Sequence, residues 1–179
     1  MTYRTSDRAH RKKQDSITPS FSHALSSLQI NHMITKLSHT TIYVDDQEKA
    51  FDVYVNKLGF KVNTDALMEN GYRWLTVNPP DQPDLEIVLM PILHESMRKS
   101  ESMPHGMDEE TVEAFRVLLK KGILGAGVMA TPDCHATYAE LKAKGLQFKS
   151  EPKEQFYGIE AVMFDGCGNW FSLTQPKEQ

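Results

Sequence analysis

The chain has 179 residues, of which 40% are hydrophobic and 25% are charged, and its formal net charge is −4. This length allows one ordinary domain or two small modules that share a core. The acidic net charge argues against a nucleic-acid-binding domain, in which a basic face is expected. The apolar runs are far shorter than the roughly 20 residues of a membrane span, so we expect neither nucleic acid nor a membrane as a partner.

The cysteine content points to a reducing compartment. Cys134 and Cys167 form no CxxC pair and are too few for a disulfide framework. Because such usage suits the cytosol, we predict a cytoplasmic location. We interpret both cysteines as ordinary small residues rather than reactive ones.

Residues 1–33 differ in composition from the rest of the chain. Arginine, lysine and serine are frequent there, and no long apolar period develops. The segment lacks the apolar stretch of a secretory signal, and its aspartates argue against a transit peptide. We predict an N-terminal extension, in which residues 21–30 have the pattern of a short amphipathic helix that packs on the domain or on a second subunit.

A strand is predicted at 37–44, and the segments after it are organised around it. Alternation places Leu37, His39, Thr41 and Tyr43 on one face of this strand, and it places Ser38, Thr40, Ile42 and Val44 on the other. Asp46 is the expected N-cap of a helix that ends before Gly59. Strands follow at 60–67, 72–77 and 85–90.

The same order of elements returns after a connector that contains a helix predicted at 107–120. A strand at 125–131 precedes the helix cap Asp133, Gly145 ends that helix, and strands are predicted near 148, at 159–164 and at 169–174. The two caps are 87 residues apart and the two glycines 86. This repeat predicts an α+β fold of two tandem βαβββ modules, which form a curved mixed sheet that encloses a cleft. We place the modules at 34–91 and 123–179, with the connector at 92–122.

Two residues of the first module have the chemistry of a metal half-site. His39 lies on its first strand and Glu86 on its last, and imidazole plus carboxylate suits a divalent ion such as Zn, Ni, Mn or Fe. The internal offsets put Ala126 at the place of His39 and Ser172 at the place of Glu86, and neither is a good ligand. The alternative interpretation is structural, since a carboxylate within an apolar strand needs a hydrogen-bonded or ion-paired neighbour.

Further residues are predicted to line the cleft. Arg73 and Trp74 are neighbours on an internal strand, so one of them faces the cleft. Trp170 and Ser172 share a strand face, and Tyr157 precedes a strand at the expected mouth. A tryptophan beside hydroxyl groups suits a flat organic ligand, with core packing as the alternative.

Several segments together resemble the glyoxalase, bleomycin-resistance and extradiol-dioxygenase family, also called the vicinal oxygen chelate superfamily. They are residues 37–46 (LSHTTIYVDD), 58–60 (LGF), 85–90 (LEIVLM) and 158–175 (GIEAVMFDGCGNWFSLTQ). The resemblance covers about residues 35–176. Metal-dependent members place a His or Gln on the first strand and a Glu on the last strand of each half, so His39 and Glu86 match whereas Ala126 and Ser172 depart from the pattern.

The resemblance implies three alternatives for function. The first is binding of a small organic molecule in the cleft, as in the bleomycin-resistance type, which sequesters its ligand without changing it. The second is a metal-dependent lyase or dioxygenase, in which His39 and Glu86 are the catalytic and metal-binding residues and the ion acts as a Lewis acid. The third is an interaction module. Family members complete their cleft within one chain or between two, which allows a homodimer.

Overall fold

The computed structural model describes residues 33–92, 94–95 and 108–177. Contacts divide the chain into two units, Met1–Thr35 and Lys36–Gln179, and the second contains all the helices and strands named below. The extension predicted at 1–33, with its amphipathic segment, therefore lies almost entirely outside the described residues. No helix among the described residues is long and apolar enough to cross a membrane.

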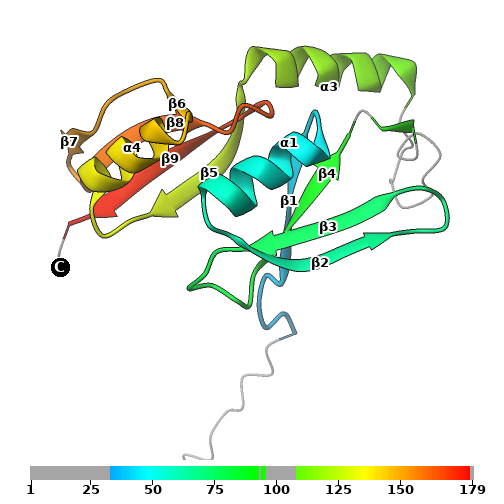
Figure 1. The fold of residues 1–179 in the computed structure, drawn as a ribbon, viewed down its shortest axis with the longest axis horizontal. Helices are drawn as coiled ribbons and strands as arrows, with labels where there is room; N and C mark the ends of the chain where they lie inside the picture. The colour runs from blue at the N-terminus through cyan, green and yellow to red at the C-terminus, as the bar shows by residue number, and fades with distance from the viewer. Residues whose placement is uncertain (1–32, 93, 96–107, 178–179) are drawn as a thin grey trace, which may run out of the picture. The chain divides into compact units, whose positions relative to one another are not determined.

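The predicted α+β class and the repeated order of elements are confirmed (Figure 1). The first half contains β1 (His39–Val44), α1 (Gln47–Phe51), the π-helical segment η1 (Asp52–Lys57), β2 (Lys61–Leu67), β3 (Arg73–Asn78) and β4 (Glu86–Pro91). Helix α3 (Glu109–Lys121) follows. The second half contains β5 (Leu124–Ala130), α4 (Cys134–Ala143), β6 (Gln147–Phe148), β7 (Lys153–Gln155), β8 (Gly158–Phe164) and β9 (Asn169–Pro176). The single strand expected near residue 148 is thus two short strands.

Each half of the chain forms its own mixed sheet. The strand order is β1-β4-β3-β2 in the first and β5-β9-β8-β6 in the second, where β7 also pairs with β8. The first and last strands of each half run parallel, and the other pairs are antiparallel. The two sheets therefore repeat one topology, although the boundaries of the modules stay a prediction.

One face of each sheet packs against helices. Ile42 and Val44 of β1 are buried in the main core cluster with Tyr54 of η1, whereas Phe171 of β9 enters the same cluster from the second sheet. His39 has the opposite parity to Ile42 along β1, so its side chain lies on the face without these helices. We call this the open face of the first sheet.

The first helix contains one more residue than its counterpart, and a π-helical segment accommodates it. Leu58 N bonds to Val53 O at 2.9 Å, which is the five-residue spacing of a π-helix. Because the extra residue lies between cap and glycine, the offset between the halves falls from 87 residues at Asp46 to 86 at Gly59. The π-helical turn also brings Tyr54 into the core, where it is fully buried.

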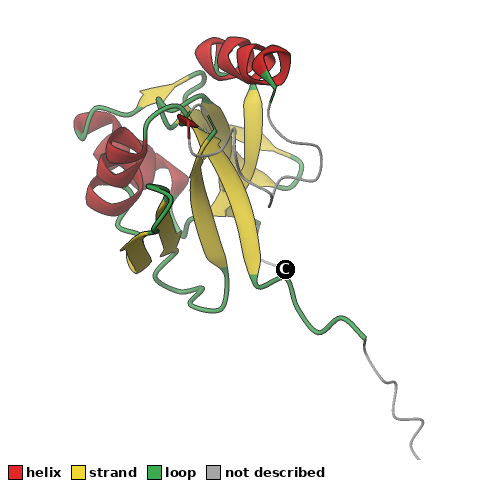
Figure 2. Ribbon diagram, turned by 90° about the vertical axis from the view of Figure 1, so that its right-hand side faces the viewer, coloured by secondary structure: helices red, strands yellow, loops and turns green. Residues whose placement is uncertain are grey.

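Helix α3 lies at one end of the strands in both ribbon views (Figures 1 and 2). The side chain of Asp108 caps its first turn by accepting from Thr111 N at 2.8 Å, and Gly122 ends it in the left-handed conformation. Its buried residues Val112 and Leu119 form a second apolar cluster with Ile92. The helix predicted at 107–120 is confirmed with bounds shifted by one or two residues.

Buried hydrogen bonds join the two halves. Tyr54 Oη donates to Asp165 Oδ2 at 2.8 Å, and Asn169 Nδ2 donates to Tyr43 O at 2.8 Å. The carboxylate of Asp165 also accepts from its own loop, through the backbone N–H groups of Cys167 and Asn169. This cluster, the junction cluster, fixes the end of β1 against the start of β9.

Candidate functional site

The two residues predicted as a metal half-site are neighbours in the structure. β1 pairs with β4 so that His39 lies opposite Glu86, and the distance from His39 Nε2 to Glu86 Oε2 is 3.5 Å. The side chains are 48% and 24% exposed, so both are accessible on the open face. Ser38 Oγ lies 3.0 Å from His39 Nδ1 and holds the other ring nitrogen.

Neighbouring donors keep Glu86 in its charged form. Hydrogen bonds from Asn63 and Thr76 and the positive charge that His39 can carry lower the pKa of Glu86. Thr76 Oγ1 donates to Glu86 Oε2 at 3.0 Å. An ionised carboxylate beside an imidazole can accept hydrogen bonds from a ligand or bind a cation.

Ala126 and Ser172, the positions compared with His39 and Glu86, are not direct partners in the second sheet. Ser172 pairs with Val128 and Trp170 pairs with Gly125, and a bulge between Gly125 and Gly127 takes Ala126 out of the register. His39 and Glu86, in contrast, lie directly opposite each other. Ser172 alternates to the same face of β9 as Trp170.

The second sheet carries a carboxylate that the sequence analysis missed. Glu160 of β8 accepts a hydrogen bond from Ser172 Oγ, which lies 2.8 Å from Thr174 Oγ1. A hydrogen bond with Glu160 also raises the pKa of Tyr157. Ser172 and Tyr157, both predicted site residues, are thus joined through Glu160. Strand alternation within 159–164 could have placed this residue on the face of Ser172.

The two sheets carry the same two residue types away from their helices. Trp74 of β3 and Glu86 of β4 share the open face of the first sheet, and Glu160 of β8 alternates to the face of Trp170 in the second. We call the face that carries Trp170 the open face of the second sheet. Each open face therefore combines one indole ring with one carboxylate.

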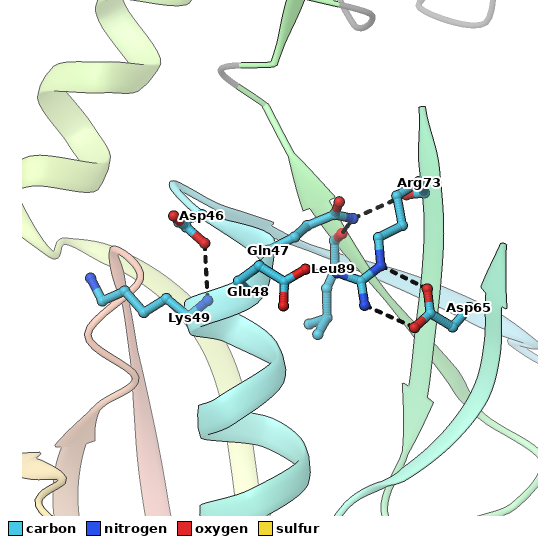
Figure 3. Close-up of polar contacts among 7 residues, drawn as sticks. All are labelled: Asp46, Gln47, Glu48, Lys49, Asp65, Arg73 and Leu89. Atoms are coloured by element: carbon cyan, nitrogen blue, oxygen red, sulfur yellow. Dashed lines mark hydrogen bonds and ion pairs between the residues drawn. The ribbon is translucent and has the colours of Figure 1, made fainter. Parts of the chain in front are cut away.

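Arg73 and Trp74 lie on opposite faces of the first sheet. The guanidinium of Arg73 forms two hydrogen bonds with Asp65, at 2.7 and 2.8 Å, and an ion pair with Glu48 (Figure 3). It also lies 5.8 Å from the centre of the Phe51 ring, on the helix-covered face. Trp74 consequently shares the open face with Thr76 and Glu86.

The ring of Trp170 rests on the backbone of the neighbouring strand. Its Nε1 donates to Ile123 O at 3.1 Å, and a Cβ atom at Gly125 would lie 2.9 Å from the ring. Glycine is therefore required beneath the indole. The side chain remains 37% exposed, so one part of the ring is fixed while another is accessible for stacking.

The donor set for a metal ion is incomplete. Within the described part of the chain, no three His, Cys, Asp or Glu side chains come together in a way that could hold a metal. His39 and Glu86 supply two ligands, whereas catalytic zinc sites ordinarily present three from the protein. His105 of the connector lies outside the described residues. These residues alone do not fit a metal centre, and no metal-dependent step follows from them.

Comparison with known proteins establishes the family. The chain matches the model of the Glyoxalase/Bleomycin resistance protein/Dioxygenase superfamily over residues 36–173. It therefore belongs to this superfamily, as the resemblance of its motifs indicated.

The chain is also similar to individual proteins. The uncharacterized protein YurT of Bacillus subtilis (strain 168) is 32% identical over 141 residues, which are 78% of this chain and 98% of YurT. The crystal structure of UcmS2 has 42% identity and a TM-score of 0.68, and the match covers 79% of this chain and 98% of UcmS2. TnmS3, an antibiotic binding protein from Streptomyces sp. CB03234, has 28% identity and a TM-score of 0.57, with 81% and 98% covered.

Proposed function

We propose that the chain binds a small organic molecule on the open faces of its sheets, with His39 and Glu86 at the polar end of the site. The observation that carries this proposal is the accessible imidazole–carboxylate pair on the same face as Trp74. An aromatic ring beside a fixed polar pair provides both stacking and orientation for a small ligand.

The second sheet offers a second set of binding groups. Its open face carries Trp170 with Glu160, Ser172 and Tyr157, which supply a second ring and a chain of hydrogen-bonding groups. The similarity to TnmS3, described as an antibiotic binding protein, supports an organic ligand of that kind. Under this proposal Arg73 acts indirectly, because its ion pairs hold β2 and β3 in register beneath Trp74.

The metal-dependent lyase or dioxygenase remains the second candidate, and the 3.5 Å approach of His39 to Glu86 favours it. Such an enzyme would need a third ligand from outside the described residues or from a second copy of the chain. We include the homodimer and the cytoplasmic location in the proposal. Sedimentation velocity tests the first, and fractionation of the source cells tests the second.

Intrinsic fluorescence gives a direct test of binding, since both tryptophans of the chain lie on the proposed faces. We expect saturable quenching by bleomycin or another aromatic antibiotic of similar size. Glu86→Gln should weaken this binding about tenfold, because a charged acceptor is lost. Glu113→Gln, which changes an exposed carboxylate of α3 bonded to Arg116, is the matched control and should bind normally.

Elemental analysis of protein purified without chelator separates the two candidates. Near-stoichiometric metal that is lost in Glu86→Gln would favour the metal-dependent enzyme. Equal binding by wild type and Glu86→Gln, or no quenching by any compound of this class, would contradict the proposed use of Glu86.

A further inference from the structure

A cavity of about 780 Å³ lies on the other side of β1 from His39. Thr40 and Ile42 line it, whereas His39 and Thr41 alternate to the open face. Its remaining wall comes from β4, β5, β9, α4 and the link between β3 and β4. The cavity therefore belongs to the helix-covered side of the sheets and is separate from the site proposed above.

Both halves of the chain contribute apolar residues to this cavity, which is partly open to solvent. Ile42 of β1 and Ile87 of β4 line it from the first half, and Met129 of β5 and Phe171 of β9 line it from the second. A volume of this size falls within the range of small-molecule sites, about 300–1,000 Å³.

The rim of the cavity is polar, but its two cations are already paired. Lys144 Nζ lies 2.7 Å from Glu140 Oε1 and donates to Lys57 O at 3.1 Å. Lys57 Nζ lies 2.9 Å from Asp52 Oδ2. Because each cation has a carboxylate partner, the cavity offers no unpaired positive charge to an anionic ligand, and Asp81 on the link between β3 and β4 is exposed to solvent. Lys144 nevertheless has one further N–H donor at the point where α4 meets the end of η1.

We propose that this cavity is a second binding site, which takes a neutral organic molecule with an apolar body and one hydrogen-bond acceptor directed at Lys144. Ile42, Ile87 and Phe171 are less than 8% exposed, so they contact the apolar body. A molecule held there touches both sheets and stabilises their arrangement. The proposal is independent of the one made for the open face.

Methyl NMR of protein labelled at methionine tests the proposal, with the neutral fluorophore N-phenyl-1-naphthylamine as the probe. Met129 lines the cavity, whereas Met90 lies on the open face beside Tyr72 Oη, 3.3 Å from its sulfur. Signals are assigned with Met129→Leu and Met90→Leu. We expect the probe to shift the Met129 signal saturably and to leave the Met90 signal in place.

A pair of variants provides the control in the same titration. Ala126→Trp fills the cavity from β5 and should weaken the probe's affinity at least about tenfold. Ala139→Trp makes the same change on the exposed side of α4, away from the cavity, and should bind the probe as the wild type does. If Ala126→Trp does not fold, the wild-type methionine shifts still decide the question.

Three outcomes would overturn the proposal. The first is the absence of saturable binding. The second is a shift of the Met90 signal without a shift of the Met129 signal, which would mean that the probe binds on the open face. The third is self-association of the wild type that Ala126→Trp abolishes, together with no binding of the probe. This result would mean that a second copy of the chain occupies the cavity. Failure of antibiotic binding at Glu86 would leave the Met129 result unaffected, so the two proposals fail separately.

Discussion

Two glutamates show how identical side chains acquire different environments on equivalent sheets. Glu86 is surrounded by donors, Asn63 and Thr76, and by an imidazole. Glu160 instead accepts from Ser172 and interacts with a phenol, Tyr157. Glu86 is thus placed to bind a cation or a hydrogen-bond donor of a ligand, whereas Glu160 is hydrogen-bonded to neighbouring hydroxyl groups.

The donors around Glu86 predict a specific change in its titration. Thr76→Val removes the hydroxyl that donates at 3.0 Å, so the pKa of Glu86 should rise toward its ordinary value. The folded-state pKa is lowered in the wild type, so this group stabilises the fold above the unfolded-state pKa, and that stability is lost as pH falls through the folded-state pKa. Thr76→Val should therefore lose part of the stability that the ionised Glu86 provides above the unfolded-state pKa.

Carbon-13 NMR of the labelled glutamate carboxyl measures this pKa directly. Thr41→Val, at an exposed position of the same open face, is the control and should leave the titration of Glu86 in place. An unchanged midpoint in Thr76→Val would show that the hydroxyl does not stabilise the carboxylate.

Strand alternation predicted much of the candidate site. It identified the face of His39, and it restricted the pair Arg73 and Trp74 to opposite faces. It did not decide between them, because that choice depends on the distant partners Asp65 and Glu48. It did not single out Glu160, because the sequence gives no sign of the hydrogen bond that joins this residue to Ser172 on the next strand.

Helix α1 and its continuation η1 show what one extra residue does to an element. The sequence predicts one helix with a cap at Asp46 and an end at Gly59, and the cap is confirmed by the bond from Lys49 N to Asp46 Oδ1 at 2.9 Å. The difference between the offsets, 87 residues at the caps and 86 at the glycines, already indicated one inserted residue. Its accommodation as a π-helical turn was not predictable from periodicity, because the spacing of apolar residues does not show where in the helix one extra residue is absorbed.

The buried hydroxyl of Tyr54 gives this element a measurable role. Burial and the charge of Asp165 raise the pKa of Tyr54, so the phenol stays a donor to that carboxylate. Tyr54→Phe leaves a buried charged acceptor with one donor fewer and should cost about 1–3 kcal/mol of unfolding free energy. Urea denaturation measures this loss.

Tyr138→Phe is the matched control for that experiment. It removes the same atom from α4, where the hydroxyl is exposed and lies 3.4 Å from Glu151 Oε1. Its effect should remain within about 0.5 kcal/mol. Equal losses in the two variants would contradict a special role for the bond between Tyr54 and Asp165.

At the scale of residues 36–179, the sequence predicted the repeated module but not how its two copies meet. Duplication implies two similar sheets, whereas their junction depends on groups that differ between the copies. Asp165 and Asn169 are 2% and 3% exposed, whereas the acids of the corresponding link in the first half, Asp81 and Asp84, are exposed to solvent. Asn169 Nδ2 donates both to Asp165 and across the junction to Tyr43 O.

The two buried thiols allow opening of this junction to be measured separately from global unfolding. Cys167 belongs to the junction cluster, and Cys134 lies in an apolar cluster within the second half. Burial raises the pKa of both thiols, most strongly that of Cys167. Because the thiolate is the reactive form, alkylation of each thiol in the native protein should require local opening.

Asn169→Asp should open the junction without unfolding the second half. The substitution removes the two donor hydrogens and places a second carboxylate beside Asp165, so we expect alkylation of Cys167 by iodoacetamide to accelerate at least about tenfold. Alkylation of Cys134 should accelerate much less. Mass spectrometry of the two peptides over a time course gives both rates. Equal acceleration would mean that the variant unfolds globally, and no acceleration would mean that Asn169 does not hold the two sheets together.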